Sequence, residues 1–188
     1  MRIYTRGGDR GKTSLIGGKR RYKDDVQVHA YGAVDEAGAF VGLASTHLEQ
    51  EGYTDMVAVL GEVSHVLWDV GADLAVPSSV EDHAFRTSVD AASSLEPLID
   101  RYAAETEKIQ KFVLRGGSFG AAYLHVACTV VRRAERHVVA LMRTEPIHEP
   151  TLRYLNRLSD LLFVMARAAN GRSHTADVAY RNSPDVFR

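Results

Sequence analysis

The sequence contains a single cysteine, almost no excess of either charge, and no apolar signal segment at its N-terminus. One cysteine cannot form an internal disulfide or a cysteine-rich zinc site, so a reducing, cytoplasmic environment is expected. A formal net charge of -1 lacks the broad positive field that a non-specific nucleic-acid binder needs. Nothing in the sequence predicts a membrane segment or disorder, and any anion site should be local.

The chain also lacks internal repeats, long linkers and strand-rich regions, and its 188 residues suffice for one domain with a sizeable core. Apolar residues recur at alternating spacings of three and four, which predicts an all-α bundle of about five helices in a single domain over residues 1–188. The predicted helices cover residues 25–50, 55–74, 88–106, 124–143 and 151–170. Trp68 is expected to anchor the second helix in the core, and Val89 belongs to the apolar set of the third.

The fourth predicted helix carries a dense ionic stripe. At about 100° per residue, one face collects a mixed set of polar and charged side chains, namely His125, Cys128, Arg132, Glu135 and Arg136. Arginine offers a fixed fork of N–H donors that suits phosphate or carboxylate oxygens, so this face predicts a polyanion site. The alternative is a solvated face with ion pairs such as Arg132 with Glu135. Cys128 is interpreted as a small packed thiol rather than a nucleophile.

Glycines, hydroxyls and cations are concentrated near the N-terminus, in the run Arg6-Gly7-Gly8-Asp9-Arg10-Gly11-Lys12-Thr13-Ser14. Such a loop offers many donors to an anion. A Walker A loop would require glycine at position 6 and a preceding buried strand, and neither condition is met. The remaining interpretations are a phosphate-binding loop of another kind and a basic surface turn.

A second glycine-rich run, Arg115 to Gly120, follows the short apolar segment Phe112-Val113-Leu114. Glycines before a helix allow the backbone to approach a ligand closely. Phe112 alone would be assigned to the core. Asp35 lies beside an apolar helical seam, and Asn156 lies near the start of the last helix, where polar groups can serve a site.

Two other classes of helical bundle fit parts of the pattern. A di-iron carboxylate protein uses Glu-x-x-His pairs on two helices. Glu62 with His65 matches one pair, but Glu145 with His148 contains Pro146 and lies in a predicted helix break. A purely structural bundle is the other alternative, although it gives no reason for two glycine-rich loops and an arginine stripe.

Several separate motifs together resemble the PduO-type ATP:cob(I)alamin adenosyltransferases, and their order and spacing match over essentially the whole chain. They are Tyr4-Thr5-Arg6-Gly7-Gly8-Asp9-Arg10-Gly11-Lys12-Thr13, Lys23-Asp24-Asp25, Tyr31-Gly32-Ala33-Val34-Asp35-Glu36, Gly116-Gly117, Leu124-His125-Val126-Ala127, Arg132-Arg133-Ala134-Glu135-Arg136 and Leu155-Asn156-Arg157-Leu158-Ser159-Asp160, with the tail Tyr180-Arg181-Asn182. The resemblance implies a ferritin-like helical bundle that forms a homotrimer with active sites at subunit interfaces. It also implies ATP and reduced cobalamin as substrates, and Mg²⁺ bound mainly through the ATP phosphates.

The resemblance assigns the nucleotide site to two parts of the chain. The implied ATP-binding residues are Thr5, Arg6, Gly8, Asp9, Gly11, Thr13, Ser14 and Lys23 from the N-terminal part, with Arg132, Glu135, Arg136 and Asn156 from the helices. Cobalt(I) is itself a strong nucleophile, so the reaction needs no catalytic serine or cysteine. The protein must instead position ATP and stabilise the charge on the departing triphosphate.

For the corrinoid, the resemblance implies roles for Asp35, Phe112 and the residue at position 128. Phe112 is expected to pack over the lower face of the corrin and displace the axial base, and it joins Arg132 and Asp35 as an implied catalytic residue. The chain departs from the family pattern at Cys128, where arginine is usual, at Gly38, and at Arg115, where proline is usual. The missing arginine is expected to leave Asp35 of a neighbouring subunit without its partner, so Cys128→Arg is expected to tighten corrinoid binding.

The implied partners follow from the chemistry. A flavoprotein reductase would supply the reduced cobalt, and a cobalamin-dependent enzyme would accept the product. Neither nucleic acid nor a membrane is expected as a partner.

Overall fold

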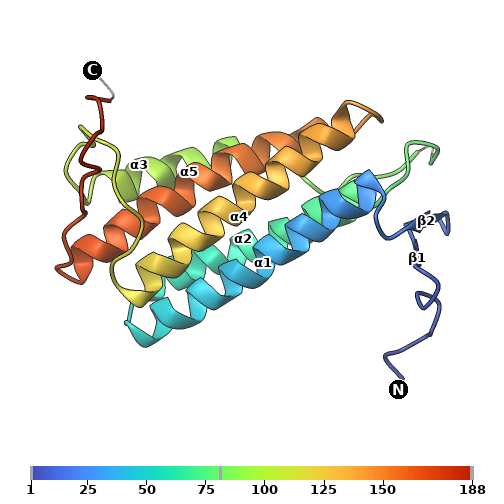
Figure 1. The fold of residues 1–188 in the computed structure, drawn as a ribbon, viewed down its shortest axis with the longest axis horizontal. Coiled ribbons are helices and arrows are strands. Elements are labelled where there is room, and N and C mark those ends of the chain that lie inside the picture. Colours follow the sequence, from blue (N-terminus) through green and yellow to red (C-terminus); the bar gives the residue numbers. More distant parts are fainter. Residues whose placement is uncertain (1, 81, 187–188) are drawn as a thin grey trace.

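The computed structural model describes residues 2–80 and 82–186 and is mainly helical (Figure 1). A two-stranded antiparallel sheet, β1 (Lys12–Ser14) with β2 (Arg20–Tyr22), precedes the helices. The helices are α1 (Val26–Gln50), α2 (Thr54–Leu74), α3 (Glu96–Ala103), α4 (Phe119–Met142) and α5 (Glu149–Arg172), with a short 3₁₀ turn η1 (Ser93–Leu95) before α3. The all-α prediction is therefore confirmed.

The helices pack side by side in the order α2, α1, α4, α5, α3. The hairpin and the N-terminus project from the end of the bundle where α1 begins, whereas the segment before α4 and the C-terminal tail lie at the opposite end (Figure 1). This arrangement separates the two glycine-rich loops of one chain by much of the length of the bundle.

α1 begins where the sequence predicts, because Asp25 accepts a hydrogen bond from the backbone N–H of Gln27 at 2.9 Å. A carboxylate in this position satisfies one of the unpaired donors of the first helical turn. The seam of α1 is buried as expected, through Ala30, Ala33, Val34, Ala37, Val41, Ala44 and Leu48.

The third predicted helix is too long. Residues 88–92 form a turn, and the α-helix begins only at Glu96, with Pro97 in its first turn. The carboxylate of Asp73 accepts the backbone N–H groups of Arg86 and Thr87, at 2.9 and 2.8 Å, and so holds the preceding loop in a non-helical path. Val89 is exposed as a result.

The prediction that Trp68 anchors α2 in the core is wrong, because its side chain is 76% exposed. It lies on the exposed face of α2. The buried set of α2 consists of smaller residues, namely Met56, Leu60, Val63, Leu67, Val70 and Leu74.

The interpretation of α4 needs a correction, since His125 and Cys128 are buried rather than on the exposed ionic face. α4 contacts α1 on one side and α5 on the other, so its apolar arc is wider than that of a helix packed on one side. Arg132 and Arg136 do remain exposed. The polar strip is therefore real but narrower than predicted.

α5 begins at Glu149, two residues before the predicted start, and Pro150 lies in its first turn. Proline is tolerated there because its missing N–H would have no intrahelical partner. No helix among the described residues has the length and apolar character needed to cross a membrane.

The burial of His125 predicts a specific dependence of stability on pH. Its ring is 2% exposed, and neither ring nitrogen has a hydrogen-bond partner among the described residues. Burial, assisted by the nearby Arg115 guanidinium, lowers the pKa of His125 to about 4. The unfolded chain, with a histidine pKa of about 6.5, therefore binds a proton between these values while the folded chain does not, so stability is lost as the pH falls from 6.5 towards 4.

We expect this single group to reduce the free energy of unfolding by about 2 kcal/mol between pH 7 and pH 5. Urea unfolding at both pH values should show a smaller loss for His125→Leu than for the unsubstituted protein. His65→Gln, at an exposed position of α2, is the matched control and should leave the pH dependence unchanged. Equal pH dependence in the parent protein and His125→Leu would contradict the assignment.

Candidate active site

The N-terminal glycine-rich run forms a closed loop on the β1–β2 hairpin. The backbone N–H of Lys23 donates to the carbonyl of Gly11 at 2.8 Å, and Arg20 donates to the carbonyl of Gly7 at 2.6 Å. Gly11 has φ of 75°, a conformation that favours glycine. The loop is thus tied to the second strand rather than to a following helix, which agrees with the rejection of a Walker A loop.

Lys23 lies directly over this loop. A Cβ atom added at Gly8 would lie 3.1 Å from the Lys23 Nζ atom, so glycine leaves room for the lysine side chain. The predicted N-terminal ligands of ATP are therefore close together in sequence and space. They present backbone N–H groups, hydroxyls and an ammonium group, which are suitable donors for phosphate oxygens.

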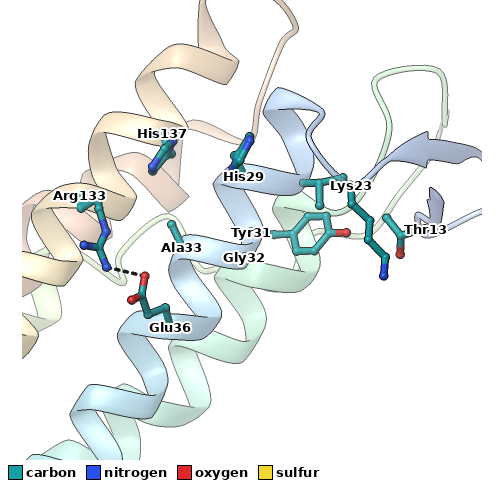
Figure 2. Close-up of a pocket in the computed structure, with 10 residues that line it drawn as sticks. Thr13, Lys23, His29, Tyr31, Gly32, Ala33, Glu36, Arg133 and His137 are labelled. Atoms are coloured by element: carbon teal, nitrogen blue, oxygen red, sulfur yellow. Dashed lines mark ion pairs between the residues drawn. The ribbon is translucent and has the colours of Figure 1, made fainter. Parts of the chain in front are cut away.

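A pocket of about 460 Å³ joins the hairpin to α1 and α4 (Figure 2). Thr13 and Lys23 line it from the hairpin side, and Arg133 lines it from α4. Arg133 forms an ion pair with Glu36 of α1, so its charge is neutralised within the chain. The rings of His29 and His137 stack at 5.8 Å on the same wall.

A second pocket, of about 380 Å³, lies between α4 and α5 and contains all the predicted helical ligands of ATP. Its lining residues are Arg132, Glu135, Arg136, Val139, Asn156, Ser159 and Asp160. We call it the α4–α5 pocket. Asn156 donates to Glu135 at 2.8 Å, and Arg132 donates through Nε to the hydroxyl of Ser159 at 3.3 Å.

The two arginines of the α4–α5 pocket form no ion pair with a described residue, although the carboxylates of Glu135 and Asp160 also line the pocket. Arg136 donates only to the carbonyl of Arg132, at 3.1 Å, and neither arginine pairs with a carboxylate among the described residues. Glu135 is instead bound to an amide. Ser159 was not predicted as a site residue, although its spacing of three from Asn156 places both on one face of α5.

The two predicted halves of the nucleotide site do not meet within one chain. Thr13 and Lys23 line the pocket at the hairpin, whereas Arg132, Arg136 and Asn156 line the α4–α5 pocket. Arg132 and Arg133 are adjacent in sequence but point to different sides of α4, as their separate pockets show.

Phe112 is exposed and held in place by backbone hydrogen bonds, so it does not belong to the core. Its N–H donates to the Ser183 hydroxyl at 2.8 Å, and its carbonyl accepts from the N–H of Tyr180 at 2.7 Å. The ring is 54% exposed. The C-terminal tail, which also forms an isolated antiparallel bridge between Ala179 and Val113, therefore holds the Phe112 segment at one end of the bundle.

Asn170 of α5 holds the second glycine-rich loop. It donates to the carbonyl of Gly116 at 3.0 Å and accepts from the N–H of Ser118 at 3.1 Å. Gly117 has φ of 121°, and a Cβ atom there would lie 1.8 Å from the Asn170 side chain. Glycine is required at this position because the amide occupies the space. No local sequence signal identifies Asn170, because its partners lie more than 50 residues away.

Cys128 is fully buried and donates through its thiol to the carbonyl of Ser159 at 3.2 Å. The prediction of a packed thiol is confirmed, and the prediction that Cys128 lies on the exposed face with Arg132 is wrong. The guanidinium of Arg115 lies over this residue, with Nη1 3.8 Å from the sulfur.

Asp35 lies on α1 in a groove of about 820 Å³ between α1 and α2. The walls are mainly apolar and include Leu67 and Trp68, and Arg86 lies at the same groove. No hydrogen bond or ion pair joins the Asp35 side chain to another described residue. Phe112 and Asp35, both assigned to the corrinoid, are therefore on separate surfaces of one chain.

Residues 3–169 match the sequence profile of the cobalamin adenosyltransferase family. The chain belongs to this family. It is 48% identical over 189 residues to the corrinoid adenosyltransferase of Bacillus subtilis, covering 100% of this chain and 96% of that protein. It is 40% identical over 167 residues to that of Citrobacter freundii, covering 88% and 93% of the two chains.

The fold is that of the same family. A structure of a variant PduO-type ATP:corrinoid adenosyltransferase from Lactobacillus reuteri, complexed with cobalamin and ATP, superposes with a TM-score of 0.93. That protein is 41% identical to this chain, and the alignment covers 99% of this chain and 100% of the other. The predicted membership of the PduO-type enzymes is confirmed, and the chain is a transferase.

The di-iron alternative is not favoured. Glu145 pairs with Arg21 at 2.7 Å, and His148 contacts the carbonyl of Thr87 at 2.8 Å, so these two side chains are engaged elsewhere. Within residues 2–80 and 82–186, no three histidine, cysteine, aspartate or glutamate side chains come together in a way that could hold a metal ion.

Proposed function

We propose that this protein transfers the 5′-deoxyadenosyl group of ATP to the cobalt of a reduced corrinoid, giving adenosylcobalamin and triphosphate. The observation that carries the proposal is the α4–α5 pocket, where Arg132 and Arg136 have no carboxylate partner among the described residues. A pocket with two such guanidinium groups favours a polyanion. Membership of the cobalamin adenosyltransferase family supports a nucleoside triphosphate as that polyanion.

The reaction demands little covalent chemistry from the protein. Cobalt(I) donates an electron pair to the 5′-carbon of ATP to form the cobalt–carbon bond, and the carbon–oxygen bond breaks with its electron pair leaving on triphosphate. The protein contributes by holding the 5′-carbon in line with cobalt and by stabilising the charge on the leaving group. Arg132 and Arg136 serve the second role, and the Glu135–Asn156 pair fixes polar groups beside them.

The separation of the two nucleotide halves supports an active site between subunits. In this arrangement each chain contributes one domain to a homotrimer. The N-terminal loop and Lys23 of one subunit cover the α4–α5 pocket of the next. A head-to-tail interface of this kind closes into a ring without leaving either half unused. Mg²⁺ is bound mainly by the ATP phosphates and adds positive charge at the leaving group.

The corrinoid site is proposed around Phe112 and Asp35. The ring of Phe112 is exposed while its backbone is held at two points, so it presents a fixed apolar surface to a planar ligand. Placed under the corrin, such a surface would exclude the lower axial base and make cobalt easier to reduce. Asp35, exposed in an apolar groove, is proposed to face the corrinoid side of a neighbouring subunit.

The cellular setting follows from the reactivity of the substrate. Reduced cobalt is a strong nucleophile, so a flavoprotein reductase is proposed to generate it at the enzyme, and a cobalamin-dependent enzyme is proposed to accept the product. A reducing cytoplasm is consistent with the single buried thiol.

Arg132→Ala and Arg136→Ala should each reduce kcat/KM for ATP by roughly tenfold to a hundredfold, because a hydrogen bond to a charged group contributes about 1.5–3 kcal/mol. Both side chains are exposed, so circular dichroism should show an intact bundle. Arg143→Ala, just beyond the end of α4, is the matched control and should retain the parent rate. Unchanged ATP kinetics in both pocket variants would contradict the proposed site.

Phe112→Ala should reduce turnover at least tenfold while the KM for ATP stays near the parent value, because the ring acts on the corrinoid rather than on the nucleotide. The exposed ring contributes little to the core, so thermal stability should change little. Electron paramagnetic resonance of bound cobalt(II) is the decisive measurement. Full activity with an unchanged four-coordinate cobalt(II) signal would exclude Phe112 from the mechanism.

A further inference from the structure

Arg115 is the first residue after the Phe112-Val113-Leu114 segment, and its guanidinium lies against α4 and α5. It lies 3.8 Å from the sulfur of Cys128 and 6.0 Å from the ring centroid of Phe163. An arginine on a loop would normally be free to rotate in solvent. Here the guanidinium packs on the buried thiol and beside the aromatic ring, because the thiol is small and the ring is flat.

This position leaves the charge of Arg115 without a strong partner among the described residues. A thiol is only a weak acceptor, and an aromatic ring near the 6 Å limit contributes little. No carboxylate pairs with Arg115 among the described residues, whereas Arg167, on the same end of the bundle, pairs with Asp177 at 2.6 Å. The positive charge nevertheless acts on a nearby group, because Arg115 is a secondary cause of the lowered pKa of His125.

The opposite charge is found on another surface of the molecule. Asp35 is exposed in the apolar α1–α2 groove and forms no ion pair or hydrogen bond with another described residue, while the neighbouring Glu36 is already paired with Arg133. The groove also contains exposed Trp68, which is poorly suited to permanent contact with water. If a second copy covers the groove, Asp35 becomes buried and needs a cation, because an unpaired buried carboxylate is costly.

We propose that Arg115 is a positioning residue of the corrinoid side of the active site, and that its guanidinium pairs with Asp35 of the neighbouring subunit. The proposal rests on the proposed function and on its arrangement of active sites between subunits. Arg115 is three residues from Phe112 and is seated on α4 and α5, whereas Asp35 lies in the groove of α1 and α2. The pair would therefore fix the neighbouring subunit relative to the Phe112 segment.

This assignment changes the expectation for Cys128. Position 128 is buried directly beneath the Arg115 guanidinium. The side chain of an arginine at position 128 would therefore compete with Arg115 for the same space. Cys128→Arg is therefore expected to lower corrinoid affinity in this chain, in contrast to the gain expected from the sequence. Cys128→Arg combined with Arg115→Ala should recover part of that loss, because the competing cation is removed.

The test is a double-mutant cycle on the full-length protein, with the KM for cob(I)alamin and the sedimentation equilibrium of the subunits as the two readouts. Arg115→Ala and Asp35→Asn should each raise the KM for cob(I)alamin about tenfold and leave the KM for ATP within a factor of two, as for a lost charge-assisted contact. The double variant should be no worse than either single one. The exchanged pair, Arg115→Asp with Asp35→Arg, should recover most of the affinity.

Arg86→Ala is the matched control, because Arg86 lines the same groove as Asp35 but lies on the loop before η1. It should change neither readout. Three results would overturn the pair. They are an unchanged KM for cob(I)alamin in Arg115→Ala, multiplicative effects of Arg115→Ala and Asp35→Asn on that KM, and an effect of Arg86→Ala in place of Arg115→Ala. Multiplicative effects would assign Arg115 to the corrinoid itself, through its amide or phosphate groups, rather than to Asp35.

Failure of the proposed function would look different. A parent protein that does not convert cob(I)alamin in the presence of ATP and Mg²⁺ would contradict the function, and the sedimentation readout would still report whether Arg115 and Asp35 are coupled between subunits. Conversion by the parent protein with no coupling in either readout would overturn the pair alone.

Discussion

α4 is packed against α1 on one side and α5 on the other, and this double burial is the constraint on which the rest of the structure depends. It requires small or apolar residues on most of the helix surface. Arg133 faces the α1 side, and a separate polar strip lies at the α4–α5 boundary. Arg132, Glu135 and Arg136 occupy that strip. α4 thus carries both arginines to the same pocket, and the lack of a carboxylate partner for either one among the described residues supports the proposed anion site.

The same packing divides the ligand-binding groups between different surfaces. The hairpin loop projects from one end of the bundle, and the Phe112 segment lies at the other (Figure 1). Among the described residues, the two arginines of the α4–α5 pocket form no ion pair although Glu135 and Asp160 also line it. Asp35 in the α1–α2 groove likewise forms none, although Arg86 lies at the same groove. The proposed head-to-tail assembly would combine these surfaces, and one helical domain could then provide sites for both a nucleotide and a corrinoid.

Local sequence signals predicted the helices well where one apolar seam and a cap agree, as at Asp25 and along α1. They failed where distant residues decide the outcome. Asp73 holds residues 86 and 87 outside a helix, and the two-sided packing of α4 buries His125 and Cys128 despite their polar neighbours. Helical spacing predicted the shared face of Arg132, Glu135 and Arg136, whereas the family resemblance assigned a nucleotide to that face and added Asn156, which the structure places in the same pocket. The contact between Arg115 and Cys128 could not be predicted, since no periodicity specifies how a loop folds back onto a helix.

The central claim is that one active site takes its N-terminal loop from one subunit and its α4–α5 pocket from another. Lys23→Ala and Arg132→Ala each disable a different half, so the most direct measurement is the rate of adenosylcobalamin formation by co-expressed mixed oligomers of the two variants. Random mixing of equal amounts gives an intact site at about one interface in four, and a return of about a quarter of the parent activity is predicted. Mixed oligomers, verified by native mass spectrometry, that remain as inactive as the separate variants would contradict the account.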